Sequence, residues 1–331
     1  MVIKPTVSII IPVYKVERVL NAVLTSIYGQ TYPIAEIILV DNHSPDSSVA
    51  VANRFASSHA KIPIRIIRRK KTYGLSDSCN LGARVARSTH VVTIHSDGLL
   101  PTKYELDKLV KPFIEDPTIV AAGPMLVHRM EEWQGYNFWQ KCLFASAVGT
   151  EIPSGNGKFD CFNRDVFLKA GGFDVKSFSN SIGAEDVDLH LRLRAMGKVV
   201  TSQARVVHAH PPDPNYTLKD WITRRKFLAL SYGRYLQLYF PREWRRQLVF
   251  FIKPLLVISM VLGFRYPFFM IPVVVFPFFY MPVMFRESLT RSNPRIILLP
   301  FILIFLICYE SFWMLNSFLF IRNARYNRST L

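Results

Sequence analysis

The chain has 331 residues, half of them apolar, and a formal net charge of +17. This length allows one large domain or two smaller ones. The charge is uneven, at net +5 over residues 1–216 and net +12 over residues 217–331. Because the excess cations flank long apolar runs, a membrane surface with anionic lipids is favoured and nucleic acid is disfavoured. The scattered cysteines exclude a disulfide framework or a cysteine-rich zinc site: Cys79, Cys142, Cys161 and Cys308.

Strand and helix signals alternate over the first 130 residues. Continuous apolar runs predict strands at residues 7–12, 36–40, 62–67 and 90–94. Helical spacing predicts helices at residues 17–28, 46–59 and 76–87. Buried strands separated by helices predict an α/β fold, with a mostly parallel sheet covered on both faces. In such sheets ligands bind beyond the carboxyl ends of the strands.

Three polar clusters follow these strands, at residues 12–14, 41–46 and 95–98. Each cluster alone is typical of a turn or a helix cap. Because the carboxyl ends of parallel strands meet at one edge, their convergence predicts a ligand site there.

An acidic pair, Glu185 and Asp186, marks the start of an amphipathic helix that carries Leu189, Leu193 and Met196 on one face. The helix dipole stabilises carboxylates in the first turn, so we expect Asp186 to stay ionised and able to accept a proton. Helix capping is the simpler alternative for such a pair.

Cations and aromatic residues interleave over residues 217–247. This mixture predicts an amphipathic helix lying in the membrane interface, with its cations on lipid head groups. Three apolar runs follow, at residues 248–264, 266–285 and 296–321, and predict a membrane region of two to four segments over residues 248–331. The first two runs are expected to form a hairpin. Glu310, inside the third, is expected to face protein, water or a functional partner instead of lipid.

Basic residues set the expected topology. Arg245 and Arg246 precede the first run, so the N-terminal half should be cytoplasmic, and no signal peptide is visible. Arg286, Arg291 and Arg295 mark a second cytoplasmic loop. The tail cations Arg322, Arg325 and Arg328 also predict a cytoplasmic C-terminal tail. A single third span after the second cytoplasmic loop would place this tail on the opposite side of the membrane. Either the last run is a bent re-entrant pair or the tail is an exception to the rule.

Several motifs together resemble glycosyltransferase family 2. They lie at residues 7–14, 36–44, 74–83, 96–97, 163–174 and 185–197, in the order and spacing of that family. The resemblance covers roughly residues 5–212 and implies a GT-A fold, a Rossmann-like sheet with helices on both faces, over residues 1–216. It also implies an inverting transferase that uses a nucleotide sugar and a divalent cation, Mn²⁺ or Mg²⁺.

The resemblance assigns roles to individual residues. It implies a nucleotide-sugar site formed by Pro12, Tyr14, Asp41, Ser44, Gly74, Asn80, Ser96 and Asp97. The family's metal-binding Asp-x-Asp corresponds to residues 95–97, where His95 replaces the first aspartate. Asp97 is therefore the expected ligand, and His95 is a ligand, a diphosphate contact or neither; a carboxylate with an imidazole suits Mn²⁺ better than Mg²⁺. His208, with His210 in reserve, is the expected histidine facing the metal or diphosphate, and two surface histidines before a turn are the alternative.

Asp186 resembles the family's general base, which takes the proton of the acceptor oxygen as that oxygen attacks the anomeric carbon. Glu185 would position the acceptor or a loop, and Gly172, Phe173 and Asp174 would shape the acceptor side. Arg192, four residues after Asp188, is expected to pair with it rather than with a diphosphate.

The combined prediction is an integral membrane glycosyltransferase with a cytoplasmic catalytic domain. Its donor would be a UDP- or GDP-sugar, since the carboxylate of Asp41 can accept a hydrogen bond from a ring N–H of either uracil or guanine. Its acceptor would be a polyprenyl phosphate, a lipid-linked glycan or another saccharide. The alternatives are a degenerate transferase that serves as a membrane scaffold, and a transporter, for which the membrane part is too small.

Overall fold

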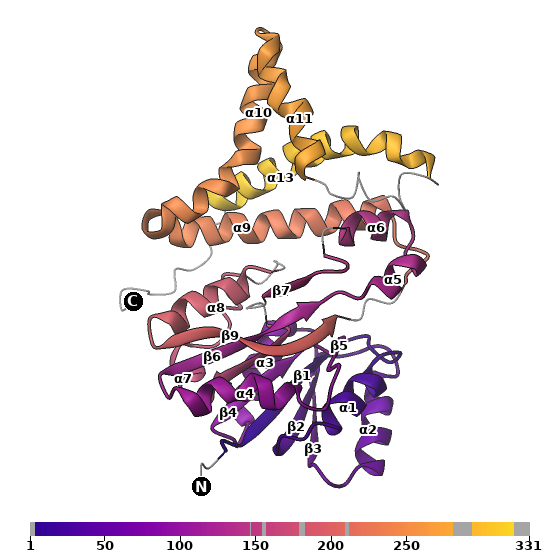
Figure 1. Ribbon diagram of the computed structural model, residues 1–331, viewed down its shortest axis with the longest axis vertical. Coiled ribbons are helices and arrows are strands. Elements are labelled where there is room, and N and C mark those ends of the chain that lie inside the picture. Colours follow the sequence, from indigo (N-terminus) through magenta and orange to yellow (C-terminus); the bar gives the residue numbers. More distant parts are fainter. Residues whose placement is uncertain are drawn as a thin grey trace.

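A computed structural model describes residues 4–145, 147–153, 157–178, 183–208, 212–280 and 293–320. A curled α/β unit holds most of residues 4–208, and a long helix crosses above it (Figure 1). A pair of shorter helices projects from the far side of this long helix. The structure therefore has a sheet-based part and a helical part that meet along one helix.

The first half of the sheet is parallel, as predicted. Its strands lie in the order β3 (Ile64–Arg68), β2 (Ile34–Asp41), β1 (Val7–Val13) and β4 (His90–Ile94). The helices between them are α1 (Leu20–Tyr28), α2 (Ser48–Ser58) and α3 (Leu75–Val85). Alternate residues of β1 face opposite cores: Ile9 and Ile11 pack with α1, and Ile10 packs with α3. Burial on both faces explains the continuous apolar runs.

The second half of the sheet is mixed, where a mostly parallel sheet was predicted. Strand β8 (Phe159–Asn163) runs antiparallel between β4 and β6 (Ile119–Val127), and β9 (Lys198–His208) is parallel to β6. Short antiparallel strands β5 (Gly98–Leu99) and β7 (Glu151–Pro153) pair with β9 and β6. The remaining helices of this half are α4 (Glu105–Glu115), α5 (Met130–Gly135), α6 (Phe138–Phe144), α7 (Arg164–Lys169) and α8 (Glu185–Arg194).

The predicted stretch 217–247 forms one helix, α9 (Leu218–Gln247). A capping box fixes its start, because Thr217 accepts from the backbone N–H of Asp220 while Asp220 accepts from that of Thr217. Trp221, near this end, is buried against aromatic side chains of α5 and α6. The helix is therefore anchored to the sheet-based part on one side.

The last helix, α13 (Leu299–Phe320), runs along α9 (Figure 1). The two backbones come close at Gly233, where a Cβ atom would lie 2.2 Å from the carbonyl oxygen of Met314. Ser317 also donates a hydrogen bond to the carbonyl of Leu230 (2.8 Å). A small residue and a hydroxyl at the crossing are typical of helices that pack tightly inside or beside a membrane.

Helices α10 (Ile252–Gly263) and α11 (Met270–Tyr280) form the predicted hairpin, with 3₁₀ turns at Leu248–Phe251, Pro267–Phe269 and, before α13, Pro294–Leu298. The hydroxyl of Ser259 donates to the carbonyl of Phe269 (2.6 Å), which closes the hairpin. Within the described residues one helical stretch, Pro294–Phe320, is long and apolar enough to cross a membrane, and those at Leu248–Gly263 and Pro267–Phe276 are shorter. Residues 281–285 and Ile321 of the predicted apolar runs lie outside the described residues, as do Arg286, Arg291 and the tail cations.

Candidate active site

The ends of β1 and β2 bring the first two polar clusters together. Val13 pairs with Asp41 in the sheet, and the backbone N–H of Asn42 donates to the carbonyl of Val13 (2.8 Å). Asp41 is 2% exposed, and its Oδ1 accepts from the backbone N–H of Ser44 (3.0 Å). Pro12 is buried at the end of β1, and the ring of Tyr14 is exposed. The predicted base and ribose residues therefore lie at one edge.

The loop before α3 is tied to the same edge. The backbone N–H of Tyr73 donates to Oδ1 of Asn42 (2.8 Å), and Arg69 forms an ion pair with Asp77 (2.6 Å) while it lies over the Tyr73 ring. Gly74 has a φ of +93°, a left-handed backbone that favours glycine. The chain can then turn from the strand ends directly into α3.

The third cluster, residues 95–97, forms a turn after β4. The backbone N–H of Gly98 donates to the carbonyl of His95 (2.9 Å), and Gly98 pairs with the backbone of His208 across β5 and β9. The main chains of the three predicted metal-binding residues thus converge. The side chain of His208 and all of His210 lie outside the part of the chain that the structure describes.

A cavity of about 280 Å³ lies between these loops and the start of α8. Its lining includes Tyr73, Gly74, Asp77, His95, Asp174, Glu185 and Asp186. The acidic pair therefore borders the same space as His95, from the turn after β4, and the loop before α3.

Asp186 is buried at the start of α8, 8% exposed. Burial and the nearby carboxyls of Glu185 and Asp160 raise the pKa of Asp186 well above its ordinary range, and Lys158 opposes this increase. Burial and the neighbouring carboxyls therefore oppose the ionisation of Asp186 that the helix dipole was expected to favour. Desolvation and like charges outweigh the dipole, which acts in the opposite direction.

The backbone at Gly157 lies directly against this carboxyl. A Cβ atom on Gly157 would lie 2.7 Å from Oδ1 of Asp186, and its φ of +72° is left-handed. The N–H of Gly157 donates to Oδ2 of Asp160 (2.9 Å). Only glycine fits this position without displacing Asp186.

Sequence reasoning missed two residues that control the electrostatics of this site. Lys158 is buried, which lowers the pKa of its amine, while the charges of Asp97 and Asp186 act to raise it. Asp160 is fully buried on β8, with Nε2 of His190 at 3.4 Å from its Oδ2. The signal was an aspartate inside a short apolar strand with a lysine directly before it, since charged residues are rarely buried without a partner.

Glu185 points back toward the loop before α8. Its Oε2 accepts from the backbone N–H of Gly183 (2.8 Å), which restrains that loop. Burial raises the pKa of Glu185 above its ordinary range, although nearby backbone N–H groups oppose the increase. The two acids thus share one buried environment but differ in their contacts.

Two of the predicted site residues, Asn80 and Phe173, contact each other within the protein. The amide of Asn80 donates to the carbonyl of Phe173 (2.9 Å) and accepts from its N–H (2.8 Å), so Asn80 clamps this turn where donor binding was predicted. Phe173, which was expected to help shape the acceptor side, is 2% exposed and packs in the core beside Phe167. Gly172 has a φ of +65°, and a Cβ there would lie 2.3 Å from Oδ1 of Asn80. Asp174 does border the cavity, and its Oδ1 also accepts from the N–H of Ser177 (2.9 Å).

The prediction for Arg192 is confirmed. Its guanidinium forms an ion pair with the fully buried Asp188 (2.6 Å), four residues earlier. The hydroxyl of Tyr239, on α9, donates to the other carboxylate oxygen of Asp188 (2.7 Å). Helix α8, which carries Asp186, is thereby connected to the long helix α9.

The described residues contain no group of three or more His, Cys, Asp and Glu side chains placed to hold a metal ion. His95 and Asp97 supply an imidazole and a carboxylate in one turn, a donor set that suits Mn²⁺. A cation held there would take further oxygen ligands from a bound substrate.

Two family models match the chain. The model described as glycosyl transferase family 2 matches residues 8–169, and that described as glycosyl transferase family group 2 matches residues 90–315. The second covers more than half of the chain and extends into its helical part.

Curated relatives carry the same description. The "PGL/p-HBAD biosynthesis glycosyltransferase" of Mycobacterium bovis is 34% identical over 186 residues, which covers 53% of this chain and 71% of that protein. The "Uncharacterized glycosyltransferase EpsJ" of Bacillus subtilis is 38% identical over 93 residues, or 28% of this chain. The chain covers only 26% of EpsJ and 17% of the Streptococcus pneumoniae "Glycosyltransferase GlyA".

Solved structures support the fold. The mannosyltransferase PcManGT from Pyrobaculum calidifontis, in complex with GDP-Man and Mn²⁺, superposes with a TM-score of 0.60 at 18% identity, over 97% of this chain and 89% of that one. GalNAc-T7 with UDP, GalNAc and Mn²⁺ gives a TM-score of 0.50 at 17% identity, over 70% and 51% of the two chains. The sheet is accordingly of the GT-A type. Together the family models, the relatives and the fold identify the chain as a member of glycosyltransferase family 2, which supports an enzyme over a scaffold.

Proposed function

We propose that the protein transfers a sugar from a UDP- or GDP-sugar to an acceptor with inversion at the anomeric carbon. The observation that carries this proposal is the cavity that Glu185 and Asp186 share with His95 and with the loop before α3. The nucleotide would lie against Pro12, Tyr14, Asp41 and Ser44, with its diphosphate toward Gly74, Ser96 and Asp97. This placement follows the rule that ligands bind at the carboxyl ends of parallel strands.

Asp186 would act as the general base. Its carboxylate takes the proton of the acceptor hydroxyl, the acceptor oxygen bonds to the anomeric carbon, and the bond to the diphosphate oxygen breaks, with its electrons leaving on the nucleoside diphosphate. A raised pKa suits this task, because a base is most effective when its pKa approaches the working pH. For a phosphate acceptor, which is already ionised, Asp186 would organise the site instead.

Asp97 would hold a divalent cation, with His95 and His208 as further donors. The cation would supply charge neutralisation for the diphosphate leaving group. Support comes from the donor set of residues 95–97 and from the Mn²⁺ present in both structural neighbours. Glu185 would hold the loop before α8, and Asp174 would border the acceptor.

The first test is donor turnover by the full-length protein in lipid. A panel of UDP- and GDP-sugars is assayed with Mn²⁺, Mg²⁺ or chelator, for wild type and Asp97→Ala. We expect metal-dependent turnover of one donor, and a donor affinity that Mn²⁺ strengthens in wild type but not in Asp97→Ala. Equal donor affinities for both proteins, with and without Mn²⁺, would contradict the proposal that a cation binds at this turn.

The acceptor would be a lipid-linked saccharide or a lipid phosphate, met at the membrane. We propose that residues 217–247 lie in the interface and that the region 248–331 is embedded, with residues 1–216 as the cytoplasmic catalytic domain. The hairpin supports this placement, since it presents apolar side chains outward: Leu255, Ile258, Val261, Phe264, Phe268, Ile271 and Val274 are each more than half exposed. Exposed apolar faces of this extent are typical of membrane contact.

A further inference from the structure

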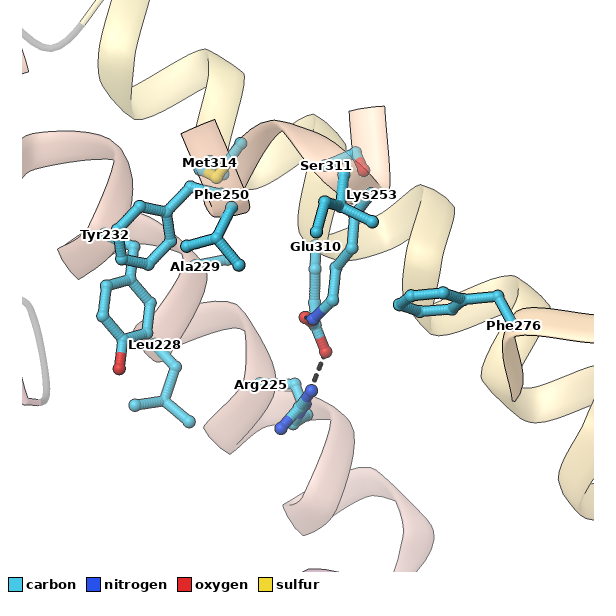
Figure 2. A pocket seen from close by; sticks show the side chains of 12 residues that line it. Arg225, Leu228, Ala229, Tyr232, Phe250, Lys253, Phe276, Glu310, Ser311 and Met314 are labelled. Carbon is cyan, nitrogen blue, oxygen red and sulfur yellow. Dashed lines mark hydrogen bonds and ion pairs between the residues drawn. The ribbon is translucent and has the colours of Figure 1, made fainter. Parts of the chain in front are cut away.

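A second cavity, of about 440 Å³, lies among the helices α9, α10, α11 and α13. Its volume falls in the range of roughly 300–1,000 Å³ that is usual for pockets that bind small molecules. Figure 2 shows Arg225, Lys253 and Glu310 gathered on one side, and Tyr232 and Phe250 grouped across from them. The cavity therefore has a charged part and an apolar part.

The charged part carries an excess of positive charge. Glu310 accepts from both Arg225 and Lys253, and its side chain is 10% exposed, against 19% and 20% for the two cations. Among the described residues that line the cavity, two cations face one carboxylate, so this lining carries more positive than negative charge in a mostly apolar environment. Charges there are costly unless an opposite charge compensates them, so the lining favours an anion.

Ser311 offers an independent sign of a ligand. It is 4% exposed, lines the cavity beside Glu310, and its hydroxyl has no hydrogen-bond partner within the described residues. Buried hydroxyls nearly always have a partner, so this one is well placed to donate to a bound oxygen.

The cavity also adjoins the active site. Leu228 lines it, and the side chain of Leu228 lies 3.5 Å from the position of a Cβ atom on Gly183. Gly183 in turn donates its N–H to Glu185. A molecule in the cavity would therefore lie one residue layer from the loop that carries the catalytic acids.

We propose that this cavity binds a lipid phosphate, with the phosphate at Arg225, Lys253 and Ser311 and the hydrocarbon chain along Tyr232, Phe250 and Met314. Guanidinium, ammonium and hydroxyl donors together match the oxygens of a phosphate ester. The opposing ring and methionine surfaces match an apolar chain. The link to acceptor delivery rests on the proposed function, whereas the binding site itself does not.

The test measures equilibrium binding of farnesyl phosphate to the full-length protein in detergent, without donor. Farnesol is the matched probe that lacks the phosphate, and inorganic phosphate is the matched probe that lacks the hydrocarbon chain. We expect wild type to bind farnesyl phosphate at least about tenfold more tightly than either, since hydrogen bonds to charged groups contribute this much or more. Competition with phosphatidylglycerol then distinguishes a membrane phospholipid, which displaces the probe, from a single-chain lipid phosphate.

Two variants and one control locate the site. Lys253→Met should weaken binding of farnesyl phosphate by roughly ten- to a hundredfold, and Ser311→Ala by several-fold without lowering the melting temperature, because its hydroxyl makes no described protein contact. Lys226→Met is the control, since Lys226 lies on α9 but over the Trp313 ring, outside the cavity lining. It should bind as wild type does.

Equal affinities of wild type for farnesyl phosphate and farnesol would overturn the proposal. So would wild-type affinity in both Lys253→Met and Ser311→Ala. Because no donor is present, either result leaves sugar transfer untouched, and an inactive donor panel would leave this binding result standing.

Discussion

At the residue scale, the environment of Asp186 determines its chemistry. Its carboxyl is buried beside Glu185 and Asp160, and these raise its pKa, while Lys158 opposes them. An aspartate in water ionises near pH 4, so the active base should form only at a distinctly higher pH. The same burial that makes ionisation difficult makes the ionised form a stronger proton acceptor.

The pH dependence of kcat/KM follows from this environment. In the proposed mechanism, transfer to a hydroxyl acceptor requires ionised Asp186, so activity should rise with pH through the raised pKa of Asp186 and fall on acidification well before pH 4. A profile of kcat/KM against pH, at saturating cation, measures this. A rate that stays flat down to about pH 4 would contradict a buried base.

Gly157→Ala should reduce turnover far more than its effect on the free energy of unfolding explains. The added Cβ would displace Asp186, and a displacement of about 1 Å from the reacting geometry can reduce the rate roughly a hundredfold. Gly149→Ala is the matched control, because φ is +77° there and the nearest atom, Sδ of Met130, would be 3.9 Å away. Both variants should lose about 1–2 kcal/mol for the left-handed backbone, but only Gly157→Ala should lose activity. Equal turnover in the two variants would show that Gly157 does not position the base.

At the scale of elements, α9 links the catalytic helix to the helical part. The hydroxyl of Tyr239 on α9 donates to Asp188 on α8, and Asp188 also pairs with Arg192 one turn later on α8. One buried carboxylate therefore connects two turns of α8 with α9. On the other side, Gly233 and Ser317 bring α13 against α9. A displacement of α9 would therefore also displace α8.

Removal of the Tyr239 hydroxyl tests this connection. Tyr239→Phe leaves an oxygen of the buried Asp188 without that donor and should destabilise the protein by about 1–3 kcal/mol, seen as a lower melting temperature. The exposed Tyr104→Phe should melt as wild type does, because it keeps the ring and removes only a solvated hydroxyl. An unchanged melting temperature in Tyr239→Phe would mean that α8 does not depend on α9.

The elements also show which features the sequence could predict. The apolar runs of the sequence predicted the strands of the parallel half and the helical hairpin. The rule that ligands bind at the carboxyl ends of parallel strands predicted where the site would lie. The antiparallel course of β8 was not predictable, because strand direction is set by contacts between distant segments and not by local pattern. For the same reason the roles of Lys158 and Asp160 became visible only once β8 lay beside β4.

On the scale of the whole molecule, one cavity lies at the start of α8 and another lies along α9. The first borders His95 and Asp186, and the second borders Glu310 and the apolar helices. The chain belongs to glycosyltransferase family 2, and we propose the second cavity as the place for the lipid part of an acceptor.

The measurement that tests the central claim most directly is the anomeric configuration of the transfer product, made by wild type and by Asp186→Asn. The full-length protein is given its donor, a hydroxyl acceptor and Mn²⁺, and the product is read by NMR. We predict an inverted product from wild type, and a turnover lower by roughly 10²–10⁴-fold in Asp186→Asn with donor binding unchanged. A retained configuration, or wild-type turnover in Asp186→Asn, would contradict single displacement with Asp186 as the base.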